Sequence, residues 1–323
     1  MWPERRRMAV LAEVPVEKWV GQVHEVRLGG NGRREVVVGG ETTLPFLRFE
    51  GALPHPPVVA IEVYDREPAD WPSPLSGAWG DALKDPGAWA KKATQFGAEI
   101  ICLRLASAHP EEGDTGADQA RRVVETVLGA VDLPLIIIGP EVPAKDNEVL
   151  VAASEVARGQ RVALGPCVEK NYRTIAAACL ADGHVAIAKT PIEINLAKQL
   201  NILLLDLGLS PDQVLVDPST GALGYGLEYS YSVMERLRVA GLQGDKMTAM
   251  PMINTVGEET WRQKESRAAG GMPPSWGEWE ERALLWEEIT AIGLLHAGSD
   301  IVVLRHPRSV EKVKGAIQAL WGK

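Results

Sequence analysis

The chain of 323 residues carries a formal net charge of −9, with 46% hydrophobic and 24% charged residues. This balance is typical of a globular protein with an apolar core, and its acidity argues against a nucleic-acid-binding surface. No apolar run reaches the roughly 18 residues of a membrane span, and no signal-peptide segment follows the arginine-rich stretch from Met1 to Met8, so we expect a cytoplasmic protein without membrane partners.

Residues 1–57 lack the regular alternation of strand and helix that the rest of the chain shows. Arg34–Gly40 and Leu44–Phe49 are short apolar segments joined by a glycine-containing turn, which predicts a β-hairpin. We expect this hairpin to cap one end of a larger body, and the proline-rich stretch from Leu53 to Pro57 to act as a stiff linker. The sequence therefore predicts an N-terminal extension over residues 1–57.

From Val58 onward one pattern recurs eight times: a short apolar strand, a loop and an amphipathic helix. Eight such units over about 265 residues are typical of an α/β fold of the (β/α)8 TIM barrel type, which we predict for residues 58–323. The predicted strands are Val58–Val63, Glu99–Leu105, Leu135–Ile138, Arg161–Leu164, Val185–Lys189, Val214–Asp217, Met247–Met250 and Asp300–Leu304. The predicted helices lie near residues 86–97, 117–131, 146–158, 170–182, 193–208, 228–240, 278–297 and 308–320.

An open doubly wound sheet is the structural alternative to a barrel. It usually has fewer strands and often a glycine fingerprint after the first one, whereas Val63–Glu67 contains no glycine. The pattern therefore favours the closed barrel.

Two connections are too long to be simple loops: Asp65–Lys84 and Asn254–Gly277. Each follows a strand and each holds two tryptophans, so both belong to the face of the barrel where functional sites are built. Tryptophans on long ordered loops indicate a protein contact or a lid, or else they fold back over the rim of the barrel.

The residues that follow the eight strands are expected to face one shared bowl, and they form no recognised catalytic set. The sequence also lacks a Gly-x-Ser-x-Gly elbow around Ser219 and a His-Glu-x-x-His metal motif. We therefore predict neither catalytic nor metal-ligating residues. The bowl residues are Asp65, His109, Glu141, Cys167, Lys189, Thr190, Asp217, Thr220, Asn254 and His306.

Four of these residues have more than one possible role. A desolvated lysine at the position of Lys189 is suited to Schiff-base chemistry, but such a lysine more often pairs with a carboxylate such as Asp217. Asp217 itself could bind a heterocycle or fix the glycine-rich loop that follows it. His306, like His109, precedes a proline and is more typical of a loop residue than of an axial ligand to a metal cofactor.

The cysteines Cys102, Cys167 and Cys179 are few and widely spaced. They lack the close pairs that an iron–sulfur cluster or a structural zinc needs, so we expect reduced thiols.

The loop after the sixth predicted strand carries a resemblance to a known family. The run from Val216 to Tyr229, which reads VDPSTGALGYGLEY, resembles the corrinoid iron–sulfur protein small subunits and acetyl-CoA decarbonylase/synthase delta subunits. The resemblance covers nearly the whole chain in matched order. Further matching stretches are 234–238, 244–247, 45–51, 57–65, 139–140 and 145–146.

This resemblance implies a non-catalytic subunit of a heterodimeric methyl carrier in the reductive acetyl-CoA (Wood–Ljungdahl) pathway of carbon fixation. The large subunit of such a protein holds a 4Fe-4S cluster and a cobalamin-binding domain, and the small barrel helps to enclose the corrinoid. The carrier takes a methyl group from methyltetrahydrofolate methyltransferase and delivers it to acetyl-CoA synthase/CO dehydrogenase. This chain lacks both a cysteine cluster motif and an Asp-x-His-x-x-Gly signature, so we expect neither the cluster nor a cobalt ligand in it.

The resemblance and strand-end position together give a predicted cofactor-facing set. The family motif covers the first six of these residues, and position at a strand end alone suggests the last three. They are Asp217, Thr220, Gly221, Leu223, Gly224, Tyr225, Thr190, Asn254 and His306.

Two other functions remain open at this point. In a stand-alone pterin-binding methyltetrahydrofolate methyltransferase, Asp217 would bind the pterin ring, because an Asp-Pro pair before a glycine-rich loop also resembles pterin-binding barrels. In a Schiff-base aldolase, Lys189 would be the nucleophile.

Overall fold

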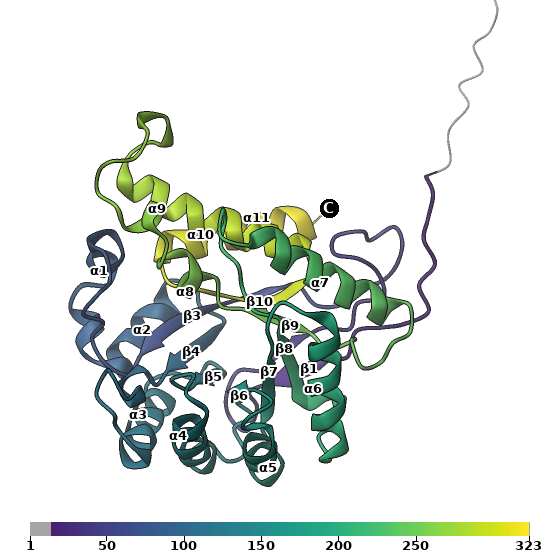
Figure 1. Cartoon of the computed structure of the whole chain (residues 1–323), viewed down its shortest axis with the longest axis horizontal. Helices are drawn as coiled ribbons and strands as arrows, with labels where there is room; N and C mark the ends of the chain where they lie inside the picture. The colour runs from purple at the N-terminus through teal and green to yellow at the C-terminus, as the bar shows by residue number, and fades with distance from the viewer. Residues whose placement is uncertain (1–13, 323) are drawn as a thin grey trace, which may run out of the picture.

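The computed structural model describes residues 14–322, and its main body is a closed barrel of eight parallel strands surrounded by helices (Figure 1). The strands follow the order β10-β3-β4-β5-β6-β7-β8-β9, and a separate two-stranded antiparallel sheet, β1-β2, precedes them. This architecture confirms the predicted TIM barrel with an N-terminal hairpin. None of the helices in residues 14–322 is long and apolar enough to cross a membrane.

Most element boundaries agree with the sequence pattern. The barrel strands are β3 (Val58–Tyr64), β4 (Ile100–Arg104), β5 (Leu135–Ile138), β6 (Ala163–Cys167), β7 (Val185–Lys189), β8 (Val214–Asp217), β9 (Met252–Asn254) and β10 (Ser299–Leu304). The helices are α1 (Ser73–Trp79), α2 (Pro86–Gln95), α3 (Ala117–Ala130), α4 (Pro143–Val156), α5 (Tyr172–Asp182), α6 (Ile194–Asp206), α7 (Leu227–Leu242), α8 (Val256–Thr260), α9 (Lys264–Arg267), α10 (Trp279–His296) and α11 (Pro307–Trp321).

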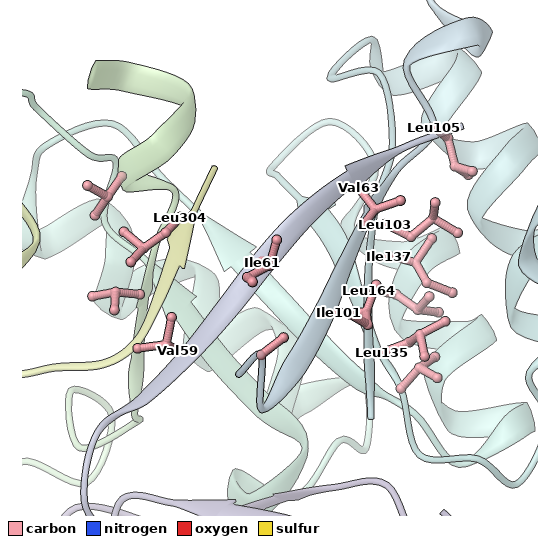
Figure 2. Packing of buried hydrophobic residues seen from close by; sticks show 14 of the residues in the cluster. Val59, Ile61, Val63, Ile101, Leu103, Leu105, Leu135, Ile137, Leu164 and Leu304 are labelled. Atoms are coloured by element: carbon pink, nitrogen blue, oxygen red, sulfur yellow. The ribbon is translucent and has the colours of Figure 1, made fainter. Parts of the chain in front are cut away.

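The strands bury both of their faces, which explains why they read as continuous apolar runs. Val58 and Ala60 of β3 point into the barrel and pack with Ile100 and Ile301. Val59, Ile61 and Val63 point outward and belong to a second, larger cluster between the strands and the helices (Figure 2). The alternation along β3 places every second residue inside the barrel.

Two predicted strand positions were wrong. The predicted strand Met247–Met250 is a turn, because the Asp245 carboxylate accepts a hydrogen bond from the Met247 N–H at 3.1 Å and the strand forms only after Pro251. The strand predicted at Arg161–Leu164 begins two residues later and ends at Cys167.

The predicted hairpin has one correct strand and one wrong strand. β2 (Val36–Val38) lies within the predicted Arg34–Gly40, but its partner is the preceding β1 (Val26–Leu28), whereas Leu44–Phe49 forms turns. Glycines between β1 and β2, including Gly30 with φ of 101°, make the reversal at that point. The first 13 residues of the predicted extension lie outside the described part of the chain.

The hairpin lies at the amino-terminal end of the barrel, away from the face where sites are built. The Arg33 guanidinium donates hydrogen bonds to the carbonyls of Val131 at 2.7 Å and Leu133 at 3.3 Å, just before β5 begins. The Arg34 N–H also donates to the Asp132 carbonyl at 2.9 Å. These bonds join the extension to the barrel.

Candidate functional site at the barrel mouth

A layer of charged side chains closes the interior of the barrel at its carboxyl-terminal mouth. Glu62, Arg104, Lys189 and Asp217 stand at the inward-facing positions near the ends of β3, β4, β7 and β8, and Arg305 follows β10. On each strand the residue two positions earlier is apolar, and in β3 and β7 these residues belong to the inner core. Along each of these strands, the barrel interior therefore changes from apolar to charged between one inward-facing residue and the next.

Glu62 is the centre of this layer because two arginines share its carboxylate. Arg104 Nε donates to Glu62 Oε1 at 2.6 Å, and Arg305 Nε donates to Oε2, with all three side chains less than 10% exposed. Burial would lower the pKa of Arg104, but the carboxylates of Glu258 and Glu62 outweigh it and raise that pKa. Both arginines therefore stay charged inside the protein.

Lys189 is held by an ion pair and is poorly suited to act as a nucleophile. Its Nζ lies 2.8 Å from both carboxylate oxygens of Glu141. Burial lowers the pKa of Lys189, but the charges of Asp217 and Glu141 outweigh burial and raise it. A protonated amine cannot attack a carbonyl, so this environment argues against the Schiff-base hypothesis.

Asp217 fixes the start of the glycine-rich loop, which is one of its two predicted roles. Its carboxylate accepts a hydrogen bond from the Ser219 N–H at 2.9 Å, and Ser219 adopts a φ of 66°, which is unusual for a residue other than glycine. Burial raises the pKa of Asp217 to about 6 in spite of the nearby Lys189 charge. The side chain is only 3% exposed.

The glycine-rich loop, residues 218–226, is anchored to helix α10. The Leu223 N–H donates to Thr290 Oγ1 at 3.1 Å, and Trp286 Nε1 donates to the Leu223 carbonyl at 3.0 Å. Tyr225 OH donates to Glu265 Oε1 of α9 at 3.2 Å. The loop therefore has a fixed position above the rim.

The glycines of this loop serve different purposes. A Cβ on Gly221 would lie 2.3 Å from the Gly226 carbonyl oxygen, so Gly221 is needed for the loop to close on itself. A Cβ on Gly224 would meet no atom, and Gly224 and its neighbour Tyr225 are exposed. Gly224 and Tyr225 thus offer open surface, while Gly221 shapes the loop beneath them.

Two polar side chains near the loop have unused hydrogen-bonding capacity. Asn254 Nδ2 donates to Thr220 Oγ1 at 3.3 Å, and the Thr255 N–H donates to the same oxygen at 3.1 Å. Asn254 Oδ1 and Thr190 Oγ1 are buried and have no partner among residues 14–322. Buried polar groups are normally paired, so these atoms are notable.

The predicted residue His306 is not in this group. It caps the amino terminus of α11, where its Nδ1 accepts a hydrogen bond from the Arg308 N–H at 3.1 Å. Its ring stacks on that of Trp261, with the two ring centroids 5.9 Å apart. Burial lowers the pKa of His306 to about 4. The side chain therefore has a structural role.

The cysteines are three buried free thiols. Burial raises the pKa of Cys167 to about 12, so it stays protonated at neutral pH. In residues 14–322 no three His, Cys, Asp or Glu side chains are grouped so as to hold a metal ion.

The two long loops fold back over the barrel rim with most of their tryptophans. Trp79 and Trp261 are almost fully buried, and Trp79 Nε1 donates to the Arg305 carbonyl at 2.9 Å. Trp71 is 9% exposed, whereas Trp276 is 42% exposed. Three of these four tryptophans therefore stabilise the mouth from inside.

Sequence reasoning missed Glu62, Arg104, Glu258 and Arg305. The signal for the first two was present, because each is a charged residue at an inward position of an apolar strand. Glu258 lies on α8 and Arg305 just past a predicted strand, and no spacing rule connects them with Glu62.

Comparisons with known proteins agree on one family. The family model described as the CO dehydrogenase/acetyl-CoA synthase delta subunit matches residues 25–312. The acetyl-CoA decarbonylase/synthase complex subunit delta of Methanocaldococcus jannaschii is 37% identical over 314 residues, which are 94% of this chain and 75% of the relative. The Archaeoglobus fulgidus subunit of the same name is 38% identical over 319 residues, covering 95% and 70% of the two chains.

Solved structures support the fold alone. The dihydropteroate synthase of Xanthomonas albilineans superposes with a TM-score of 0.58 at 15% identity, covering 92% of this chain and 99% of that one. The Thermus thermophilus enzyme gives a TM-score of 0.55 at 14% identity, covering 87% and 100%.

Proposed function

The chain belongs to the CO dehydrogenase/acetyl-CoA synthase delta subunit family, and on this premise we propose that it is the non-catalytic small subunit of a heterodimeric corrinoid iron–sulfur protein. Its large subunit would hold the 4Fe-4S cluster and most of the corrinoid. The heterodimer would carry a methyl group from methyltetrahydrofolate methyltransferase to acetyl-CoA synthase. The relatives bear the names of complex subunits, which supports an assembly with partner chains.

The observation that carries the proposal is the chemistry of the mouth beside β7, β8 and β9. A corrinoid is a broad ring edged with amide groups, and bound cobalt would supply the site that accepts the methyl group. Gly224 presents exposed backbone with no Cβ to obstruct a ring, and the exposed Tyr225 lies beside it. The buried oxygens of Asn254 and Thr190 have no partner among residues 14–322 and are potential acceptors for amide N–H groups. The residues present therefore fit this cofactor.

Each member of the predicted set has a place in this proposal. Asp217, Thr220 and Leu223 hold the loop in position through the hydrogen bonds described above. The Gly221 N–H adds a further bond to Ser230 Oγ at 2.7 Å. Gly224 and Tyr225 form the exposed surface toward the ring, and Thr190 and Asn254 are buried near it with one unpaired oxygen each. His306 caps α11 and stacks on Trp261, so in this proposal it supports the rim.

The charged layer supports a binding role in preference to catalysis. Glu62, Arg104 and Arg305 are bonded mainly to one another, and Lys189 is bonded to Glu141. Groups neutralised in this way form a rigid floor but offer neither a free base nor a free nucleophile.

The experiment that tests this function is co-purification from the native host with a visible spectrum. We expect a larger chain to copurify and the complex to show a corrin absorption band, while the isolated chain binds cobalamin poorly. Copurification without any corrinoid-bearing partner would contradict the proposal.

Calorimetry with methyltetrahydrofolate on the isolated chain separates the corrinoid protein from a pterin enzyme. Because the Asp217 carboxylate is buried and already bonded to the Ser219 N–H, we expect no binding. Micromolar binding that Asp217→Ala abolishes would favour the methyltransferase instead.

A further inference from the structure

A second hollow lies on the other side of the mouth, between the ends of β3 and β4 and the segment α8–α9. This cleft has a volume of about 320 Å³. Five arginines line it, against three carboxylates: Asp70, Glu112 and Glu258. We call it the arginine cleft; its arginines are Arg66, Arg104, Arg262, Arg267 and Arg305.

The innermost of these arginines has an unused donor. Arg305 is only 4% exposed, its Nε donates to Glu62 and its Nη2 donates to Tyr64 OH at 2.5 Å. Its Nη1 has no acceptor among residues 14–322. Because Arg305 lines the cleft and this nitrogen is not among the buried unpaired atoms, Nη1 is open to an acceptor from outside the chain.

Unused donors also occur nearer the rim. Arg66 Nε is buried without an acceptor in the described chain, while Arg66 Nη2 contacts Glu112. Arg262 uses Nη1 for Glu259 at 2.7 Å, which leaves the rest of its guanidinium unused. Arg66, Arg262 and Arg305 therefore each keep a donor without an acceptor in the described chain. Arg104, in contrast, donates to three carboxylates.

The ion pairs at the rim can rearrange at low cost. Arg66 pairs with Glu112 and Arg267 pairs with Asp70, and all four side chains are about a third exposed or more. Exposed pairs contribute roughly 0 to 1 kcal/mol, so an incoming anion can compete for these guanidiniums. Trp71 and Trp261 provide apolar wall area for the rest of such a ligand.

We propose that the arginine cleft binds a small organic oxyanion, with a carboxylate or phosphate group placed against Arg305 and the rim guanidiniums. Guanidinium groups bind both kinds of oxyanion through paired N–H donors. The volume is at the lower end of the range for small-molecule pockets, which suits a ligand of metabolite size. The inference concerns this chain alone and does not depend on the corrinoid function.

Isothermal titration calorimetry on the full chain tests it, with inorganic phosphate in one arm and glutarate in the other at constant ionic strength. We expect saturable binding with one site in at least one arm. Tighter binding of phosphate identifies a phosphate ligand, and tighter binding of glutarate identifies a carboxylate ligand.

The variants Arg66→Gln and Arg262→Gln each remove rim donors without touching the buried pair of Arg305 with Glu62. Each should weaken binding by at least about 10-fold, which corresponds to one charge-assisted hydrogen bond. Arg308→Gln, on α11 outside the cleft, is the matched control and should bind as the wild type does. Absence of saturable binding in both arms, or equal binding by the rim variants and the wild type, would overturn the proposal.

Discussion

The two sides of the barrel mouth are built on different principles. On the side of β7, β8 and β9, the glycine-rich loop exposes Gly224 and Tyr225, and the Thr190 hydroxyl and the Asn254 amide are buried near it. On the side of β3, β4 and β10, arginines surround the buried carboxylate of Glu62. We propose that the first side contacts a corrinoid ring and that the second side binds a small anion.

The difference also concerns what holds each side in place. The glycine-rich loop depends on single neutral hydrogen bonds to α10 and on close backbone packing at Gly221. The arginine side depends on buried charges, whose loss costs more than the loss of a neutral bond. Each side should therefore respond differently to substitution.

The largest effect is expected at the centre of the arginine side. Glu62→Gln leaves Arg104 and Arg305 buried without their shared carboxylate, and we expect a loss of about 3–5 kcal/mol in the free energy of unfolding. Chemical denaturation measures this loss. Glu280→Gln, which removes an exposed partner of Arg308, is the control and should cost less than about 1 kcal/mol. Similar losses in both variants would show that the buried network contributes little.

A smaller effect is expected at the glycine-rich loop, where two glycines can be compared directly. Gly221→Ala places a methyl group 2.3 Å from the Gly226 carbonyl oxygen and should cost about 2–3 kcal/mol in the free energy of unfolding. Gly224→Ala meets no atom but keeps a φ of 75°, so its cost should be about 1 kcal/mol. Equal costs at the two positions would contradict the internal role assigned to Gly221.

Carboxylates on the two sides should give opposite pH dependences. Burial raises the pKa of Asp217 to about 6, so the folded state holds this proton more tightly than the unfolded state does, and stability falls as the pH rises from the unfolded pKa to about 6. Asp217→Asn should remove this loss, on the order of 3 kcal/mol, so the variant should gain stability relative to the wild type over that interval.

Glu258 should behave in the reverse way. Burial alone would raise its pKa, but Arg104 and Arg305 outweigh burial and lower the pKa to about 2. Its ionised form therefore stabilises the folded state above the unfolded pKa of about 4.5, and this contribution is lost as the pH falls toward 2. Denaturation of Glu258→Gln across this range should show its deficit shrinking in acid. The opposite pH dependences would be contradicted if the stabilities of Asp217→Asn and Glu258→Gln, each relative to the wild type, changed in the same direction with pH.

Sequence periodicity was sufficient for the barrel because each strand and each helix carries its own local pattern. It was insufficient where a local interaction decides the structure, as at Asp245, whose side chain forms a turn inside the predicted strand Met247–Met250. His306 illustrates the same limit at the site. Its position after a strand suggested a cofactor contact, yet Pro307 at the first helical position makes it a helix cap.

The charged layer could be predicted only in part. Glu62 and Arg104 interrupt apolar strands at inward positions, so their burial follows from the alternation of the strand. That Glu258 and Arg305 join them depends on the closure of the barrel, which brings β10 beside β3. The glycine-rich loop was found because its chemistry is contiguous in the sequence.

Hydrogen–deuterium exchange of the chain in its complex tests whether the glycine-rich loop faces the corrinoid. We expect the amides of residues 218–226 to be protected when the partner carries its corrinoid and to exchange faster when the same partner is corrinoid-free. Equal exchange of this loop in the two complexes would contradict the claim that this side of the mouth faces the ring.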